Sequence, residues 1–429
     1  MVQVQQINQS QCGKILIEHL REKQSAILSW LKAHETSKEL PLYSSVDIRD
    51  ACFKIAVVDT NLFPAGFNNL CEHGIADASK YLRQAVLERV PSCRDILIVA
   101  EDHTRNTWYL ENIRVIKEIT QNAGFAVKIA MFFDIQPEFC ENGGSVQLET
   151  ATKKLVRIHC LRRLLEKFPV DQPHFDLIIL NNDLTGGIPQ ILKESQIPIY
   201  PSIQAGWHSR SKSRHFKLAN ELLKEFAKII NMDPWFFSCL YRTIDQVDIN
   251  QEADRQKIKL LANDLFEEIK HKYRQHRIEE KPFIFIKSDS GTYGMNVVPI
   301  EDPQDILELN RRARNNLSKG KSAQVIDRFL LQEGVPTAYQ IGDQVSEACV
   351  YQITNNMVGG FYRSNAAKSE RENLNSPGME LKTMCPHLPK YGLDEIHPDV
   401  NIFDVYRVLA RIAGIAAHRE IVQMEQDKE

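Results

Sequence analysis

Short, almost wholly apolar segments alternate with longer segments of helical periodicity in the first half of this chain, and this alternation constrains the fold more than any other feature. The apolar segments span residues 54–59, 95–100, 126–132, 175–180 and 197–200, and the helical segments span roughly 75–90, 108–122, 150–168 and 188–195. Strands that are apolar on both faces and alternate with helices are typical of a parallel sheet covered on both sides. We therefore predict an α/β domain over residues 51–215.

The remaining segments follow a different order. Residues 10–36 have helical periodicity and predict an N-terminal helical segment within residues 1–50, and the charged residues 216–277 predict connecting helices over 216–280. From residue 282 onwards hairpins alternate with helices, with strands at 325–332, 345–354 and 357–362 and helices at 302–318 and 402–424. This order predicts an α+β domain with antiparallel sheets over residues 281–429.

The composition argues against several classes of protein. A chain of 429 residues is long enough for about two or three domains. The net charge of −3 argues against nucleic acid as a main partner, and the apolar runs are too short to cross a membrane. The first residues lack the basic and apolar regions of a signal peptide, so we expect a cytoplasmic protein. The nine cysteines form no C-x-x-C pair, which indicates free thiols in a reducing compartment and not zinc ligands or a disulfide framework.

Polar loops follow four of the five predicted strands, at residues 59–70, 101–107, 181–187 and 201–215. Ligands of parallel α/β sheets bind outside the carboxyl ends of the strands, which is where these loops lie. Asp, Asn, Thr and Gly are also ordinary turn and cap residues, so any single loop has a purely structural explanation. Four converging polar loops nevertheless favour a site for a polar small molecule.

The segment F-I-F-I-K-S-D-S-G-T-Y-G-M-N-V-V, residues 283–298, predicts a strand, a small-residue loop and a second strand. The first strand ends at Lys287, and the loop contains Ser290, Gly291, Thr292 and Gly294. Such a loop can lay backbone N–H groups over a polyphosphate beside a fixed lysine charge, although ordinary surface hairpins share the pattern. The chain has neither the G-x-G-x-x-G fingerprint nor a complete P-loop, so any nucleotide site would depend on this hairpin.

Two more segments would complete a nucleotide site. The strand at 325–332 runs into Gln332, Glu333 and Val335, which could offer hydrogen-bonding groups to the edge of an adenine. Glu347 lies in an otherwise apolar strand, where a carboxylate is costly unless it is paired or bound to a metal.

Residues 359–378 bring together Arg363 and several oxygen-bearing side chains. Glutamate and asparagine oxygens suit Mg²⁺, and Arg363 could neutralise the charge that develops on a transferred phosphoryl group. Charged segments of this kind are more often solvated loops. The functional interpretation gains weight because Lys287, Glu333 and Glu347 precede the segment in a workable order.

That order resembles the ATP-grasp superfamily. Within it, the chain resembles the proteobacterial glutamate–cysteine ligase (γ-glutamylcysteine synthetase) family. The residues that carry the closer resemblance are V-V-D-T-N-L-F-P-A-G-F-N-N-L-C at 57–71, Q-A-G-W-H-S-R-S-K-S-R-H at 204–215, I-F-I-K-S-D-S-G-T-Y-G-M-N-V at 284–297 and G-G-F-Y-R-S-N at 359–365. The resemblance extends over nearly the whole chain.

The resemblance implies an ATP-dependent ligase that joins the side-chain carboxylate of L-glutamate to the amine of L-cysteine, the first step of glutathione synthesis. ATP would convert the carboxylate into an acyl phosphate, which the amine then attacks. Such catalysis needs positioning and charge neutralisation more than a nucleophilic side chain. The implied partners are these small molecules, with neither nucleic acid nor membrane, and a homo-oligomer stays open.

The resemblance also assigns roles to individual residues. The catalytic residues would be Lys287 and Arg363, and the ATP site would comprise Lys287, Ser290, Gly291, Thr292, Gly294, Gln332, Glu333 and Val335. The Mg²⁺ ligands would be Glu347, Glu372 and Asn373, with Glu370 and Asn375 as competitors because related ligases have a tighter acidic-x-Asn pair. The substrate ligands would be Asp59, Asn61, Asn68, Arg105 and Arg210, since a guanidinium pairs bidentately with an amino-acid carboxylate and Asp59 could bind the ammonium group.

Three alternatives stay open at this point. Another ATP-grasp ligase would join a different acid and amine, and a non-catalytic ATP-binding protein would keep the hairpin without turnover. A sugar- or anion-binding module would use the α/β loops alone. The oxygen-rich cluster from Glu347 to Asn375 disfavours the last two, because a pure binding protein has little use for so many metal-type ligands.

Overall fold

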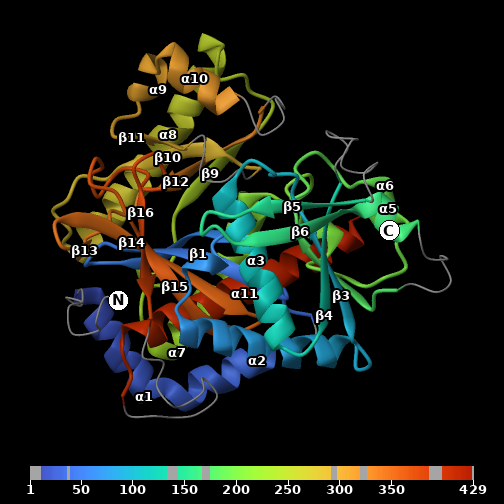
Figure 1. The fold of residues 1–429 in the computed structure, drawn as a ribbon. Coiled ribbons are helices and arrows are strands. Elements are labelled where there is room, and N and C mark those ends of the chain that lie inside the picture. Colours follow the sequence, from blue (N-terminus) through green and yellow to red (C-terminus); the bar gives the residue numbers. More distant parts are fainter. Residues whose placement is uncertain are drawn as a thin grey trace.

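The computed structural model describes residues 11–35, 39–132, 144–166, 174–290, 297–318, 326–385 and 399–427. Three β-sheets form the framework of this part of the chain (Figure 1). The central sheet is antiparallel and has the strand order β16-β15-β14-β1-β2, with the short β13 paired to β14. Its strands are β1 (Tyr43–Asp50), β2 (Ile55–Asn61), β13 (Gln340–Ile341), β14 (Gln344–Ile353), β15 (Asn356–Ser364) and β16 (Glu380–Met384). The mixed sheet has the order β5-β6-β4-β3-β7-β8, and the hairpin sheet has the order β11-β10-β12-β9.

The other two sheets differ in strand direction. In the mixed sheet all neighbours are parallel except the β5–β6 hairpin, and its strands are β3 (Asp95–Ala100), β4 (Ala126–Met131), β5 (Ser145–Glu149), β6 (Leu155–Cys160), β7 (Leu177–Asn181) and β8 (Ile199–Tyr200). The hairpin sheet is antiparallel and contains β9 (Tyr241–Ile244), β10 (Ile284–Ser288), β11 (Val297–Ile300) and β12 (Phe329–Glu333).

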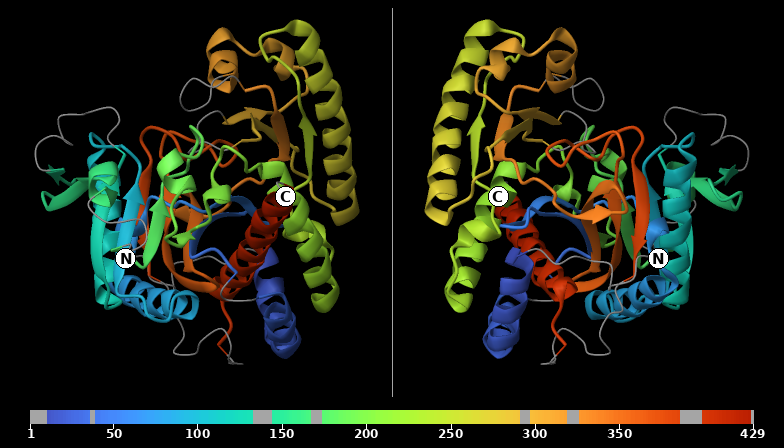
Figure 2. Two further views of the ribbon diagram at one scale, coloured as in Figure 1. Left: turned by 90° about the vertical axis from the view of Figure 1, so that its right-hand side faces the viewer. Right: turned by 90° about the vertical axis from the view of Figure 1, so that its left-hand side faces the viewer.

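The helices lie against the faces of these sheets. They are α1 (Gln11–His34), α2 (Glu72–Arg89), α3 (Thr107–Asn122), α5 (Leu161–Leu165), α6 (Gln190–Lys193), α7 (Lys212–Ile230), α8 (Glu252–His276), α9 (Asp305–Glu308), α10 (Arg311–Ser318) and α11 (Ile402–Gln426). Helices α2 and α3 share a core with both the central and the mixed sheets, and α8 packs on the hairpin sheet (Figures 1 and 2).

Strand β14 shows why the central sheet is covered on both faces. Ala348 and Val350 belong to the core formed with α1, α7 and α11, whereas Cys349 and Tyr351 belong to the core shared with α2, α3 and the mixed sheet. Successive side chains of a strand point to opposite faces, so a strand that is apolar throughout must be buried on both sides.

Helix α11 is buried around almost its entire circumference, and its buried charged residues, Asp404, Arg407, Arg411 and Glu420, all have ion-pair partners. A capping box between Asn401 and Asp404 begins the helix. It packs against α7, α1 and strands β1 and β2, and Figure 2 shows it close to α1 and α7. Helix α11 therefore joins the N-terminal and C-terminal parts of the chain in one core.

The predicted combination of a parallel α/β region and an antiparallel α+β region is confirmed. The helices predicted at 10–36, 75–90 and 108–122 correspond to α1, α2 and α3, within the residues that the structure describes, and the predicted strands at 95–100 and 126–132 are β3 and β4. The predicted strands at 175–180 and 197–200 are β7 and the short β8, and the predicted helix at 188–195 is the single turn α6. In the second half, the hairpin of residues 283–298 is formed by β10 and β11.

Three local predictions were wrong. Residues 150–168 do not form one helix: Val156, Ile158 and Cys160 alternate on the buried face of β6, and α5 covers only Leu161–Leu165. The strand at 54–59 is β2 of the antiparallel central sheet, because a short apolar run does not specify the direction of its neighbour. Strands β1, β5, β9, β13 and β16 were missed, and β1, from the predicted N-terminal helical segment, pairs with β14 from the predicted ATP-binding region.

The cysteines agree with the expectation of free thiols at seven positions: Cys12, Cys52, Cys71, Cys93, Cys239, Cys349 and Cys385. The expectation was wrong at Cys160, which is disulfide-bonded. Among the described residues, no helix is both long enough and apolar enough to cross a lipid bilayer.

Candidate active site

A cavity of about 1040 Å³ lies where the three sheets meet. Strands β1, β2, β14, β15 and β16 of the central sheet, strands β10, β11 and β12 of the hairpin sheet, and the loops after β2, β3 and β7 all contribute to its lining. The predicted convergence of four polar loops is therefore present. The four segments predicted as polar loops contribute Asp59 and Asn61 at the end of β2, Lys212 at the start of α7, and the loop residues Asn68, His103, Asn106, Asp183 and Trp207 to the cavity wall.

Buried hydrogen bonds join the loops that follow β2, β3 and β7, at the carboxyl ends of the strands. The Tyr109 hydroxyl donates to the carbonyl oxygen of Asn181 (2.7 Å) and accepts from the backbone N–H of Glu101 (2.9 Å). The Asn181 side chain in turn donates to the carbonyl oxygen of Pro64 (3.1 Å). The ends of β2, β3 and β7 are therefore held together, although β2 belongs to another sheet.

Two lysines and one aspartate form the most charged part of the wall. The ammonium group of Lys212 contacts both carboxylate oxygens of Asp59, at 2.6 and 2.8 Å, and Lys287 donates to the carbonyl oxygen of Val58 (3.3 Å). Burial and the nearby charge of Lys212 lower the pKa of Lys287 to about 8, although Asp59 opposes the shift. Burial alone would raise the pKa of Asp59, but Lys212 and Lys287 hold it well below its ordinary value. Two cations facing one anion leave a net positive charge, which suits an anionic ligand.

Lys212 was not predicted, although it lies in the quoted segment 204–215. It begins α7, and Asp289, directly after β10, fixes this end of the helix: the N–H of Ser213 donates to the Asp289 carboxylate (2.8 Å), and the N–H of Lys212 donates to the Asp289 carbonyl (2.8 Å). This contact between α7 and β10 brings Lys212 next to Lys287. The sequence offered a polar, basic loop as a signal, but nothing local identified which of its cations faces the cavity.

A network of alternating charges lies beside the lysines, on three neighbouring strands. Glu347 of β14 is directly opposite Arg363 of β15, and its two oxygens accept from Arg363 and from Arg49 of β1, each at 2.6 Å. Arg363 also pairs with Asp47 (3.2 Å). Burial would raise the pKa of Glu347, but the two arginines outweigh it and lower the pKa. Burial would likewise lower the pKa of Arg363, yet Asp47 and Glu347 raise it well above its ordinary value. We call Asp47, Arg49, Glu347 and Arg363 the charge network.

Gln332, Glu333 and Val335 line the cavity at the hairpin sheet, as the adenine prediction requires. The carboxylate of Glu333, however, is held by Lys54 (2.7 Å), by the indole N–H of Trp235 (2.9 Å) and by the N–H of Leu240 (2.9 Å). All three partners of the Glu333 carboxylate belong to the protein itself, so this side chain has a stabilising role. An adenine edge would meet backbone groups and Gln332 at this place.

The segment predicted to hold metal is folded against the protein. Leu374 is fully buried, and Asn373 and Asn375 line the cavity. Glu372 does not line the cavity: its carboxylate accepts from Lys368 (2.8 Å) and from the N–H of Ser369 (2.9 Å). Of the predicted metal ligands, the structure brings Glu347 and Asn373 to the cavity and leaves Glu372 outside it.

The other predicted site residues have different locations. Arg105 is exposed, and Arg210 is buried in an ion pair with Glu420 of α11 (2.9 Å), so neither lines the cavity. Ser290 is exposed beside Ser288 (3.2 Å between the hydroxyl oxygens) and does not line the cavity either. The predicted phosphate-binding residues Gly291, Thr292 and Gly294 lie outside the described residues.

Arg210→Met is expected to destabilise the fold by about 3–5 kcal/mol, because it leaves the fully buried Glu420 without its charged partner. Urea unfolding followed by circular dichroism measures this change. Arg214→Met, whose ion pair with Asp427 is partly exposed, is the control and should cost about 1 kcal/mol or less. Equal stabilities of the two variants would show that the Arg210–Glu420 pair does not stabilise the fold.

The chain has a mixed α/β architecture with a cavity where three sheets meet, and two lysines around one aspartate give part of its wall a net positive charge. Residues 18–421 match the family model GshA, described as glutamate-cysteine ligase. A crystal structure from Methylobacillus flagellatus KT, of a protein provisionally named gamma-glutamylcysteine synthetase, is 32% identical, has a TM-score of 0.82, and aligns over 96% of each chain. The chain therefore belongs to the glutamate-cysteine ligase family, as the resemblance in its sequence predicted.

More distant structures overlap less well. D-alanyl-alanine synthetase A from Vibrio cholerae is 12% identical with a TM-score of 0.34, over 75% of this chain and 81% of that one. A glutathione synthetase-like effector from Globodera pallida is 10% identical with a TM-score of 0.38, over 87% of this chain and 85% of that one. Neither overlap is close enough to show a shared fold. No curated protein matches the chain significantly.

Proposed function

We propose that the chain is an ATP-dependent ligase that joins the γ-carboxylate of L-glutamate to the amine of L-cysteine through a γ-glutamyl phosphate, the first step of glutathione biosynthesis. The observation that carries this proposal is the convergence of Lys287, Lys212 and the charge network on one cavity, in a member of the glutamate-cysteine ligase family. A cytoplasmic location, where ATP and both amino acids occur together, remains a prediction.

ATP would occupy the end of the cavity formed by the hairpin sheet. Phe285, Gln332 and Val335 line this end and would receive the base. Lys287 lies near the end of β10 in the same sheet and lines the cavity together with the charge network, so its ammonium group would contact the phosphates. The positive charge shared by Lys287 and Lys212 supports this orientation, because each additional phosphate oxygen in a poorly solvated cavity needs a cation or a donor nearby.

The reaction would proceed in two displacements. A γ-carboxylate oxygen of glutamate attacks the γ-phosphorus of ATP, the bond to the bridging oxygen breaks, and ADP leaves. The uncharged amine of cysteine then attacks the acyl carbon, loses a proton, and phosphate leaves with the C–O bond. Lys287 and Arg363 would neutralise the charge on the transferred phosphoryl group, and the cavity would hold the carboxylate and amine in line.

The lining residues fit a magnesium ion. Asp47, Glu347, Asn373 and Asn375 line the cavity and carry side-chain oxygen atoms, and hard oxygen donors are what Mg²⁺ prefers. Bound together with ATP, the ion would lower the negative charge on the phosphates. Both oxygens of Glu347 are engaged by Arg49 and Arg363, and the amide oxygen of Asn373 accepts from the N–H of Asn375. Asp47 shares one oxygen, with Arg363, so it is the better-placed ligand in our proposal.

The amino acids would bind at the loop end of the cavity. Asn61 and Asn68 keep their proposed substrate roles because they line this end. Asp59 also lines the cavity, but its two oxygens are engaged by Lys212, so we propose that it orients this lysine. Arg105 and Arg210 are not part of the proposed substrate site.

Phosphate release with Mg²⁺ and ATP is expected only when L-glutamate and L-cysteine are both present, with γ-glutamylcysteine as the product. The measurement is a phosphate-release assay with each amino acid alone and with both, combined with mass spectrometry of the product. Release with a different acid or amine would indicate another ligase of the same chemistry. ATP binding without release in any mixture would instead indicate a non-catalytic protein and contradict the proposal.

A further inference from the structure

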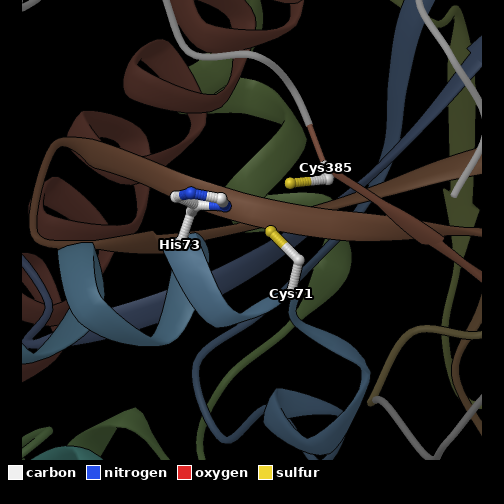
Figure 3. Close-up of side chains that lie close together, drawn as sticks. All are labelled: Cys71, His73 and Cys385. Atoms are coloured by element: carbon white, nitrogen blue, oxygen red, sulfur yellow. The ribbon is translucent and has the colours of Figure 1, made fainter.

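Three metal-ligating side chains gather outside the cavity. Figure 3 shows the sulfur atoms of Cys71 and Cys385 and the imidazole of His73 directed toward one another. One ligand atom of each residue lies within 4.8 Å of the other two. Cys71 and Cys385 are half-buried and His73 is exposed, so a cation could reach the group from solvent. None of the three lines the cavity of the candidate active site.

The fold brings these residues together from distant parts of the sequence. Cys71 is the N-cap residue of α2, where its side chain makes no capping hydrogen bond, and His73 lies in the first turn. Cys385 directly follows β16, the edge strand of the central sheet. A Cβ atom at Gly74 would lie 2.4 Å from the carbonyl oxygen of Val358, so glycine allows the start of α2 to lie directly on β15.

We infer that Cys71, His73 and Cys385 form a binding site for a thiophilic divalent cation of the zinc type. Two thiolates and one imidazole are a recurrent set of zinc ligands, with a water molecule in the fourth position. Zinc–sulfur bonds of about 2.3 Å and zinc–nitrogen bonds of about 2.0 Å need donors that are less than about 4 Å apart, so small side-chain movements suffice. Soft thiolate ligands select against Mg²⁺, which the candidate active site would use.

The position of the site gives it a structural consequence. Asn68 and Asn69 line the cavity shortly before Cys71, and Lys382 lines it shortly before Cys385. A bound cation would therefore fasten the loop after β2 to the end of edge strand β16, and so connect two walls of the cavity. This inference does not depend on the proposed ligase activity.

Cobalt(II) added to the full-length, reduced chain is the direct test, because thiolate coordination gives an intense ultraviolet charge-transfer band and tetrahedral geometry gives visible bands. We expect one equivalent to bind and zinc to displace it. Cys71→Ser and Cys385→Ser should each weaken binding more than tenfold, since even the loss of a group that only supports a ligand costs about tenfold or more. Zinc should also raise the melting temperature of the wild-type chain but not of Cys385→Ser.

Two controls keep the test decisive. Serine is a favoured N-cap residue, so Cys71→Ser should fold normally without metal. Cys52→Ser removes a free, exposed cysteine elsewhere in the chain and should leave cobalt binding unchanged. The inference is overturned if the reduced chain shows no thiolate-to-cobalt band, or if Cys52→Ser and Cys385→Ser bind alike. It is also overturned if Cys71 and Cys385 form a disulfide in the purified chain and bind no cation after reduction.

Discussion

Lys287→Ala is expected to lower ATP-dependent formation of γ-glutamylcysteine at least about a hundredfold. The side chain is buried at the cavity, and its charge would face the transferred phosphoryl group, where water cannot replace it. Stability should change little, because Lys212 still neutralises Asp59 in the variant. Steady-state kinetics with saturating amino acids and varied ATP measure the loss. Lys257→Ala, which removes an exposed lysine from α8, is the matched control and should keep full activity.

The pH dependence provides a second test of Lys287. Its pKa of about 8 means that the free enzyme keeps this charge below pH 8 and loses it above. We therefore expect kcat/KM for ATP to be level below about pH 8 and to fall as the pH rises further, since kcat/KM reports the free enzyme. Lys287→Arg, whose guanidinium does not titrate in this range, should remove this alkaline decline. Full activity of Lys287→Ala, with unchanged affinity for ATP, would contradict the assigned role.

Arg363→Met is expected to lower turnover by about a hundredfold to a thousandfold and to destabilise the fold by about 3–5 kcal/mol. The first effect follows if Arg363 neutralises charge during phosphoryl transfer. The second follows because Asp47 loses its ion pair and Glu347 keeps only Arg49. Turnover should be measured below the melting temperature, with the folded fraction determined by circular dichroism, so that the two effects are separated.

Arg407→Met is the matched control for Arg363→Met. Arg407 is also buried and ion-paired, to Asp404 at 3.0 Å, but it lies on α11 and does not line the cavity. This variant should lose comparable stability and keep its turnover. If Arg363→Met, fully folded, turns over as fast as Arg407→Met, Arg363 has a structural role alone.

Much of the candidate site could be predicted from local sequence patterns. The alternating run that ends at Lys287 indicated a strand with a terminal lysine, and Lys287 is the penultimate residue of β10 and lines the cavity. The polar residues after the strands indicated a site at their carboxyl ends, and Asp59, Asn61 and Asn68 are there. These predictions depend on the period of a strand and on the common edge of neighbouring strands, which a few consecutive residues express.

Predictions about the role of a charged side chain were less successful, because its partners are distant in the sequence. Arg210 lies in a loop that reaches the cavity, yet its partner Glu420 is on α11. Glu333 and Glu347 line the cavity, but the sequence did not indicate that Lys54 and Trp235 would hold the oxygens of Glu333, or Arg49 and Arg363 those of Glu347. Lys212 was missed for the same reason.

The sequence by itself determined most of the helices and strands and the membership of the glutamate-cysteine ligase family. The secondary structure and the family membership can both be recognised from short segments, since periodicity and motifs involve only a few neighbouring residues. The tertiary structure alone decided that β1 pairs with both β2 and β14, that Arg49 and Arg363 both pair with Glu347, and that Cys71 lies close to Cys385. The physical reason is that these partners come from strands and helices that are distant in the sequence, so only their packing, which also buries the charge network, brings them together.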